Sequence, residues 1–192
     1  MARSKQFDQQ AVVDKAITVF TANGYHGTSA QDLVEALGLS RSSLYDTFGD
    51  KQGLFLHALQ QYHRQAFGPV IDLLTHTTDP LATLHQLFAE AIALNVRSGA
   101  QGGCLVINSA TELEALDAAV APLVQQSLQA VEDALVMAIN RGQQAGTIST
   151  RHGARALARS LHTTLTGLRV MAKAGASQQA FEDVSHLALS LL

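Results

Sequence analysis

Between Thr28 and Lys51 the sequence carries the pattern that most constrains how this chain can fold. Two short segments with apolar residues at helical spacing stand there on either side of a glycine. Thr28 or Ser29 can cap the first segment, and Gly38 has the backbone freedom that ends it. Ser40 can cap the second segment. The pattern predicts two short helices joined by a tight turn.

The second segment has few apolar residues for a helix that belongs to a core. Leu44 and Phe48, four residues apart, are its apolar anchors, and its other positions are small, polar or cationic. Such a helix is suited to contact a hydrated, anionic partner. A helix-turn-helix unit places its second helix in the major groove of DNA. We therefore expect this segment to bind double-stranded DNA.

The same stretch resembles the N-terminal signature of the tetracycline-repressor-like (TetR/AcrR) family of bacterial transcriptional regulators. The residues that carry the resemblance are Phe20, Gly24, Tyr25, Thr28, Ser29, Asp32, Leu33, Gly38, Leu39, Ser40, Leu44, Tyr45, Phe48, Lys51, Leu54 and Phe55. Val34 and Leu37 stand where the family usually has alanines. Ser42 replaces a common glycine, and Thr47 replaces a common aromatic residue or histidine. The rest of the chain resembles the family in length and helical pattern.

The resemblance implies an all-α fold of about nine helices in a homodimer. Residues 1–52 would form the helix-turn-helix DNA-binding domain, and residues 53–192 would form the ligand-binding and dimerisation domain. It further implies a one-component repressor that a small-molecule effector releases from a palindromic operator. The two recognition helices of the dimer would lie about 34–36 Å or somewhat more apart along the DNA.

The expected DNA contacts follow from the resemblance and from side-chain chemistry. Arg41 can reach a guanine edge or a phosphate, and Lys51 can bind a phosphate as a point charge. The family implies that Tyr45 contacts the DNA backbone. Arg3 and Lys5 could form a basic arm, but a frayed terminus is the simpler interpretation. The predicted contacts are Thr28, Ser29, Arg41, Ser42, Ser43, Tyr45, Thr47 and Lys51.

Composition supports the fold but does not by itself point to DNA. Apolar residues make up 47% of the 192 residues and there are three prolines, which favours a folded helical protein. The net charge is −3, and the first 52 residues carry five Lys and Arg against six Asp and Glu. The DNA-binding prediction therefore depends on the motif and not on the overall charge.

Other functional classes find little support in the sequence. The eight histidines lack zinc-binding spacings, and no nucleophile elbow is present, so we expect no catalytic residue, metal ligand or cofactor. The sequence has no signal segment and no apolar run of membrane-spanning length, which predicts a cytoplasmic protein without a membrane partner. A helical ligand- or protein-binding module that no longer reads DNA remains an alternative.

The last two predicted helices, about 150–173 and 177–192, are apolar on more than one side. A helix that is only half covered by its own domain would have a single apolar stripe. We therefore expect both helices to pack against a second copy in a four-helix bundle. The predicted dimer residues are Leu157, Leu161, Leu165, Leu168, Phe181, Val184, Leu187 and Leu191.

A ligand pocket is expected from the family resemblance, among the helices of the larger domain. Polar residues on otherwise apolar helices are the local sign of it. The candidates are Asn95, Cys104, Asn108, Glu112, His162, Thr166 and Arg169. Cys104 also stands at a helix start, where backbone amides can activate a thiol, so a redox-sensing regulator is a second alternative. The simpler interpretation is a small buried residue.

Overall fold

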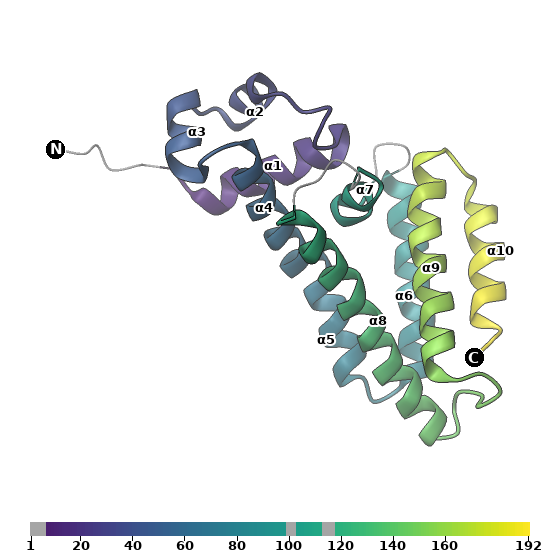
Figure 1. Ribbon diagram of the computed structural model, residues 1–192. Coiled ribbons are helices and arrows are strands. Elements are labelled where there is room, and N and C mark those ends of the chain that lie inside the picture. Colours follow the sequence, from purple (N-terminus) through teal and green to yellow (C-terminus); the bar gives the residue numbers. More distant parts are fainter. Residues whose placement is uncertain (1–6, 99–102, 113–117) are drawn as a thin grey trace. The chain divides into compact units, whose positions relative to one another are not determined.

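A computed structural model describes residues 7–98, 103–112 and 118–192 of the chain. The proposed basic arm in residues 1–6 lies outside this part. The described residues form helices and no strand, which confirms the all-α prediction (Figure 1). They group into two compact units, and each unit is described by itself.

The first unit contains the helix-turn-helix. Its boundaries are at Arg64, at Leu105 and at Val124, so that it includes the start of the long helix α8. Its helices are α1 (Gln9–Asn23), α2 (Ala30–Leu37), α3 (Arg41–Phe48), α4 (Lys51–Tyr62), α7 (Leu105–Glu112) and the beginning of α8 (Val120–Gln144).

Local signals define where the short helices of this unit begin and end. The Asp8 carboxylate accepts hydrogen bonds at the start of α1, and the Asp50 carboxylate accepts one at the start of α4. Ser29 and Asp32 form a reciprocal capping box at the start of α2. Gly38 ends that helix in the left-handed conformation at φ 66°. The predicted helix–turn–helix boundaries are thereby confirmed.

The core of this unit is aromatic. Phe20 of α1 and Phe55 of α4 meet edge to face with ring centroids 4.9 Å apart, and both are fully buried. Leu33 of α2 and Leu44 of α3 are also fully buried. The two short helices therefore rest on a rigid base that α1 and α4 provide.

A proline separates α4 from the next helix. After α4 the chain forms one π-helical turn over His63–Phe67, and α5 (Gly68–His76) begins with Pro69 in its first turn. Proline lacks the amide hydrogen that an uninterrupted α-helix needs there. The wider turn absorbs this break in the hydrogen-bond ladder.

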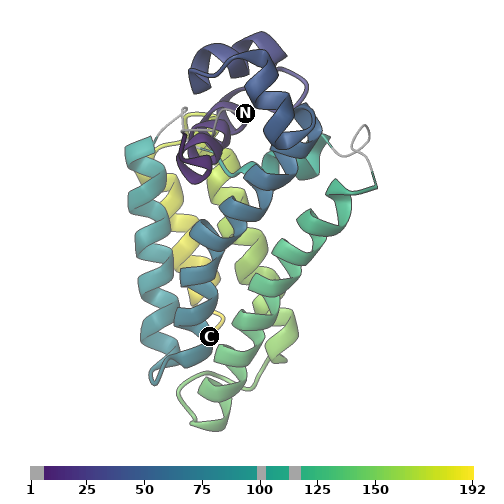
Figure 2. The same ribbon diagram turned by 90° about the vertical axis from the view of Figure 1, so that its left-hand side faces the viewer.

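The second unit contains α5, α6 (Pro80–Ser98), the remainder of α8, α9 (Ala154–Lys173) and α10 (Gln178–Leu189). The helices α6, α9 and α10 pack against one another (Figure 2). Leu84, Phe88, Leu135, Leu161 and Phe181 are among its buried core residues. Arg141 of α8 donates to the carbonyl oxygens of Leu74 and Thr75, which satisfies the C-terminal end of α5.

The predicted domain boundary lies between residues 52 and 53. The two compact units instead divide the chain after Arg64, before Leu105 and after Val124. The whole of α4 belongs to the first unit, because Phe55 packs on Phe20. Helix α7 also belongs to it, although it follows α6 of the second unit in the sequence. The chain therefore leaves the first unit after α4 and returns to it for α7.

Candidate nucleic-acid interface

Helix α3 has one apolar side and one polar side. Leu44 and Phe48 are buried against the rest of the first unit. Arg41, Ser42 and Asp46 are exposed, and Ser43, Tyr45 and Thr47 are partly exposed. The apolar side fixes the helix on its base, and the polar side is open to solvent.

Arg41 and Tyr45 lie on adjacent turns of this helix. The guanidinium carbon of Arg41 is 5.7 Å from the centroid of the Tyr45 ring, which is a cation–π contact. The ring supports the long arginine side chain while leaving its donors exposed. This arrangement is compatible with a contact to a guanine edge or to a phosphate.

The predicted serines of α3 cluster at its first turn. The Ser40 hydroxyl donates to the Ser43 hydroxyl over 2.9 Å, and it accepts from the Ser43 amide over 3.2 Å. The Ser40 and Ser42 hydroxyl oxygens are 3.1 Å apart. Ser42 is exposed and Ser43 is partly exposed, so both remain candidates for DNA contacts.

The three other predicted threonine and serine contacts also have structural partners. Thr28 is only 1% exposed, and its hydroxyl donates to the carbonyl oxygen of Gly24 over 2.6 Å. Its side chain therefore faces the interior, which corrects the prediction of a phosphate contact there. The Thr47 hydroxyl donates to the Ser43 carbonyl over 2.7 Å. Ser29 is exposed and holds the capping box.

The capping box also sets the charge of its carboxylate. Hydrogen bonds from the backbone amide and the hydroxyl of Ser29 lower the pKa of Asp32 below its ordinary value. Asp32 is therefore ionised at neutral pH and stabilises the N-terminus of α2.

Lys51 has a structural role that sequence reasoning missed. Its ammonium donates to the carbonyl oxygens of Tyr25 over 3.0 Å and of Thr28 over 2.9 Å. It also lies 4.2 Å from the centroid of the Tyr25 ring. Lys51 thus ties the loop between α1 and α2 to the first turn of α4, and a phosphate contact by the same ammonium stays a prediction.

The carboxylate of Glu112 binds backbone amides of the same loop. Its Oε2 atom accepts from the Tyr25 amide over 2.9 Å and lies 3.4 Å from the donating His26 amide. Asn108, one turn earlier on α7, donates to the Thr21 carbonyl over 2.9 Å. Both residues were expected to line a ligand pocket. The structure gives them partners in α1 and in the α1–α2 loop, and a ligand contact by either stays a prediction.

Gly24 makes this contact possible. It has φ 74°, and a Cβ atom there would stand 2.1 Å from Oε1 of Glu112. A side chain at this position would therefore displace the carboxylate. The sequence shows Gly24 as part of the family signature. It does not show that Glu112, 87 residues after Tyr25, contacts this loop.

Of the other predicted pocket residues, His162 and Arg169 share one region of the second unit. Burial lowers the pKa of His162, the nearby Glu132 opposes this shift, and Arg169 adds to it. The guanidinium carbon of Arg169 is 5.8 Å from the Phe67 ring centroid. Thr166, on the same helix as His162, is partly exposed.

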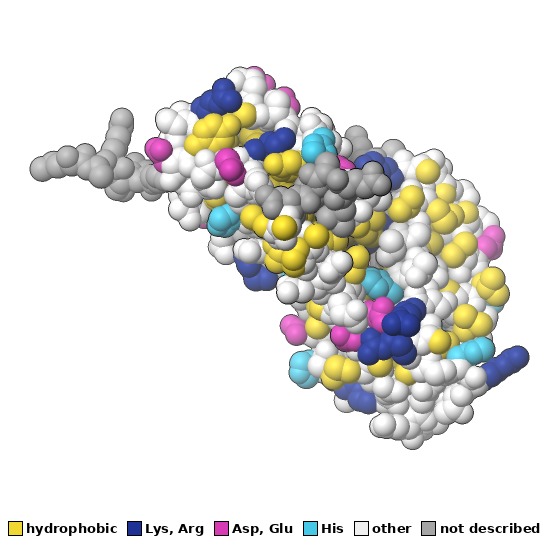
Figure 3. All heavy atoms as spheres, viewed as in Figure 1, with side chains coloured by type: hydrophobic (Ala, Val, Ile, Leu, Met, Phe, Trp, Pro, Cys, Tyr) yellow, Lys and Arg dark blue, Asp and Glu magenta, His cyan; other side chains and the backbone are white. Residues whose placement is uncertain are grey.

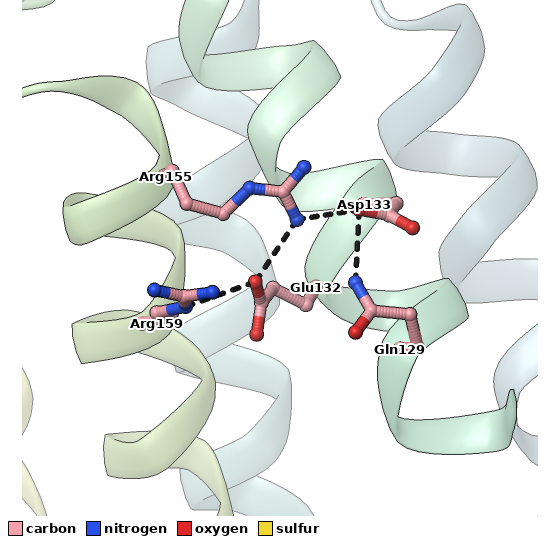
Figure 4. A network of polar contacts seen from close by, with 5 residues as sticks. All are labelled: Gln129, Glu132, Asp133, Arg155 and Arg159. Atoms are coloured by element: carbon pink, nitrogen blue, oxygen red, sulfur yellow. Dashed lines mark hydrogen bonds and ion pairs between the residues drawn. The ribbon is translucent and has the colours of Figure 1, made fainter. Parts of the chain in front are cut away.

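Glu132 belongs to a network of charges between α8 and α9 (Figure 4). It accepts from Arg155 over 2.9 Å and from Arg159 over 3.2 Å, while Arg155 also binds Asp133 over 2.6 Å. These contacts lower the pKa of Glu132 and Asp133, with the hydrogen bond from Arg155 as the largest cause.

Asn95 and Cys104 are buried at other positions. Asn95 is 7% exposed, and its amide nitrogen has no hydrogen-bond partner among the described residues. A buried donor without a partner is costly, so this atom is a candidate for ligand contact. Cys104 is 1% exposed, which agrees with the interpretation as a small buried residue.

The structure corrects half of the predicted dimer surface. Leu157, Leu161, Leu168 and Phe181 are at most 2% exposed in the single chain, because α9 and α10 pack against α6 and each other. They therefore belong to the core of their own unit. Leu165 is partly exposed.

The remaining predicted residues lie on α10 or just after it and are open. Val184 is 39% exposed, Leu187 is 69% exposed and Leu191 is 40% exposed. Val170 of α9, which the sequence analysis did not select, is 54% exposed. Apolar side chains are scattered over α9 and α10 at the right of Figure 3. We call Val170, Val184, Leu187 and Leu191 the α9–α10 seam.

Comparison with known proteins identifies the family. Residues 12–58 match the model of bacterial regulatory proteins of the tetR family, and residues 80–187 match that of the tetracyclin repressor-like C-terminal domain. This chain belongs to the TetR family. TetR-family regulators are DNA-binding transcription factors that act as dimers with small-molecule effectors, as the resemblance implied.

Alignments with related proteins cover all or nearly all of this chain. The uncharacterised HTH-type transcriptional regulator YezE of Bacillus subtilis is 34% identical, with all of both chains covered. The HTH-type transcriptional repressor ComR of Escherichia coli is 30% identical, over 98% of this chain and 90% of ComR.

Solved structures of the family have the same fold. A cysteine mutant of the TetR family transcriptional regulator CifR, complexed with 26 bp double-strand operator DNA, is 28% identical with a TM-score of 0.82. The alignment covers 98% of each chain. The regulatory protein TetR from Rhodobacter sphaeroides superimposes with a TM-score of 0.85 at 22% identity, over 95% of this chain and 97% of that one.

In the part of the chain that the structure describes, no helix is both long enough and apolar enough to span a bilayer. No group of three or more His, Cys, Asp or Glu side chains there is arranged to hold a metal ion.

Proposed function

We propose that this TetR-family regulator represses transcription from a palindromic operator, which its homodimer grips with two copies of α3. A small-molecule effector binds the second unit and releases the DNA. The protein acts by binding rather than by catalysis. The observation that carries this proposal is α3 itself, whose apolar side is locked on an aromatic base while its polar side is open.

The α9–α10 seam supports the dimer. Val184 and Leu187 are three residues apart, which places them on one side of α10, and Leu191 follows the end of that helix. Val170 adds an exposed apolar side chain on the adjacent helix α9. Two copies of this pair would form a four-helix bundle with a two-fold axis.

The second unit supplies candidates for effector contact. Arg169 lies beside the Phe67 ring, His162 is close enough to Arg169 for their charges to interact, and the buried Asn95 amide nitrogen has no partner among the described residues. Small-molecule sites are typically lined by apolar side chains with a few polar groups among them. We propose that the effector lies in this unit and contacts one or more of these three residues.

The two units are linked in a way that permits allosteric release. The chain continues from α4 into α5 and from α6 into α7, and α7 carries the Glu112 carboxylate that holds the α1–α2 loop. An effector that shifts these connections changes the placement of α3. A coupling of about 1–3 kcal/mol would change operator affinity roughly 5- to 150-fold.

A gel shift with the DNA upstream of the chain's own gene tests the proposal. We expect a discrete complex whose affinity falls as salt rises, because phosphate contacts release counterions. Unrelated DNA of the same length is the control. Equal binding to both DNAs, or no binding at low salt, would instead favour a helical module that no longer reads DNA.

A further inference from the structure

Asp46 is a residue of α3 that neither the motif nor the fold has explained. It is exposed, and its carboxylate makes no hydrogen bond or ion pair with any residue that the structure describes. It does not belong to the predicted DNA contacts, which are otherwise concentrated on this helix. Its position and its charge make it informative.

The geometry of α3 places Asp46 on its outermost side. Leu44 and Phe48 mark the buried side. Ser42 and Asp46 are four residues apart, so they share one side, and each is two residues from a buried anchor. Two residues correspond to slightly more than half a helical turn, which sets this pair opposite the core. In a helix that enters the major groove, the side opposite the core faces the bases.

The charge of Asp46 is unfavourable for general DNA binding. It is the acidic residue of a helix whose single cation is Arg41. A carboxylate near the phosphates is repelled, and an ionised carboxylate can only accept hydrogen bonds. In the major groove the donors are the amino groups of cytosine and adenine. Adenine presents the acceptor N7 beside its amino group, whereas the edge of cytosine presents its amino donor alone.

We propose that Asp46 determines specificity by accepting a hydrogen bond from the N4 amino group of one cytosine in each operator half-site. The inference rests on the proposed entry of α3 into the major groove. The carboxylate opposes binding to most sequences and favours those that place cytosine against it. The charge of Asp46 therefore lowers affinity for most base pairs at this position and allows binding where cytosine donates to the carboxylate.

The test uses the full-length protein and a pool of random double-stranded DNA. Wild type, Asp46→Ala and Asp46→Asn are each used to select binding sequences, and affinities are then measured on the selected duplexes. For Asp46→Ala we expect the cytosine preference to fall by roughly 5- to 150-fold at one position of each half-site. For Asp46→Asn we expect adenine to replace cytosine there, because asparagine binds the adenine N6 and N7 atoms.

Glu35→Gln is the matched control. Glu35 is exposed on α2 and accepts from Gln31, so its replacement removes the same charge from the first unit without altering α3. We expect it to leave the selected sequence unchanged. Because Asp46 is exposed, its variants are expected to fold, and circular dichroism checks this.

The outcomes separate the inference from the proposed function. If wild type selects no sequence, DNA reading by α3 is refuted and the inference falls with it. If wild type selects a motif and both Asp46 variants select the same motif, the regulator stands and the role of Asp46 is refuted. The role of Asp46 is also refuted if an Asp46 variant gains affinity for random DNA, as Glu35→Gln would, and keeps the sequence preference of the wild type.

Discussion

The two units of this protein are built from the same kind of element but are held together in different ways. In the first unit, α1, α2, α3 and α4 each begin at a residue whose side chain caps the helix. In the second unit, Ser177 caps α10 and Asp79 accepts a hydrogen bond at the start of α6, but α9 follows Gly153, which has no side chain to cap it, and α5 begins without a capping side chain. There the buried apolar faces of the long helices carry the structure.

Polar contacts between distant segments show the same contrast. In the first unit, Glu112 and Lys51 bind backbone groups of the α1–α2 loop. In the second unit, Arg141 donates to two backbone carbonyl oxygens of α5. The network of Glu132 with Arg155 and Arg159 involves exposed arginines, and such pairs contribute little to stability. The first unit therefore concentrates its directional bonds on the loop before α2, while the second unit combines one such contact with more extensive apolar packing.

The largest effect is expected in the core of the second unit. Leu161→Ala should lower the free energy of unfolding by about 2–5 kcal/mol, because a fully buried leucine leaves a cavity. Chemical denaturation followed by circular dichroism measures this. A loss below about 1 kcal/mol would show that apolar packing is less important in this unit than we infer.

Leu187→Asp should act on assembly and not on the fold of the chain. The side chain is 69% exposed in the single chain, and a charge in the α9–α10 seam would be buried without a partner in the dimer. We expect a folded monomer by analytical ultracentrifugation.

Leu94→Asp is the control for the seam, since Leu94 is 48% exposed on α6. It should remain a dimer. A dimeric Leu187→Asp variant would show that the seam lies elsewhere.

Gly24→Ala tests the directional bonds of the first unit. The positive φ alone costs about 1–3 kcal/mol with a Cβ atom, and the collision with Glu112 adds to this. Thermal unfolding and operator affinity should both decline. Gly146→Ala isolates the first cause, the positive φ, because Gly146 has φ 72° and open space around it. If the two variants lose equal stability, the contact with Glu112 is unimportant.

Arg41→Ala and Lys51→Ala should weaken DNA binding in different ways. Loss of a base contact by Arg41 would relax the preference at one position per half-site by about 1–3 kcal/mol. Loss of Lys51 should weaken all sequences alike, since its ammonium supports the loop before α2. Competition with random DNA distinguishes them. Equal losses on operator and random DNA for Arg41→Ala would make it a phosphate contact.

The smallest effect concerns pH and the second unit. Burial, opposed by Glu132 and assisted by Arg169, lowers the pKa of His162 below its ordinary value of 6.5. The unfolded chain therefore binds a proton more readily, so this contribution to stability is present above that value and is lost as pH falls below it. The carboxylates with lowered pKa values lose their contribution only at lower pH, below 4.5 for Glu132.

Urea denaturation between about pH 8 and pH 5 measures this dependence. His162→Gln should make the stability less dependent on pH in that range, whereas His186→Gln, at an exposed position of α10, should leave the dependence unchanged. If the stability of His162→Gln depends on pH as strongly as that of the wild type, burial of His162 is not the cause of the dependence.

Much of the first unit could be predicted from its sequence. The helix starts at Ser29 and Ser40 and the turn at Gly38 were expected and are present. These signals are local, because a capping hydrogen bond joins residues two or three positions apart. The open positions of α3 could be predicted for the same reason, since Leu44 and Phe48 define its buried side.

The sequence alone determined the helical class, the helix-turn-helix and the identity of its recognition helix. The tertiary structure decided which apolar side of α9 and α10 is internal: Phe181 is buried, whereas Leu187 is open. It also placed the Glu112 carboxylate against the backbone amides of the α1–α2 loop. When a helix has apolar residues on several sides, its sequence does not show which side packs within its own unit. A contact between residues 87 positions apart, such as Tyr25 and Glu112, produces no periodic pattern in the sequence.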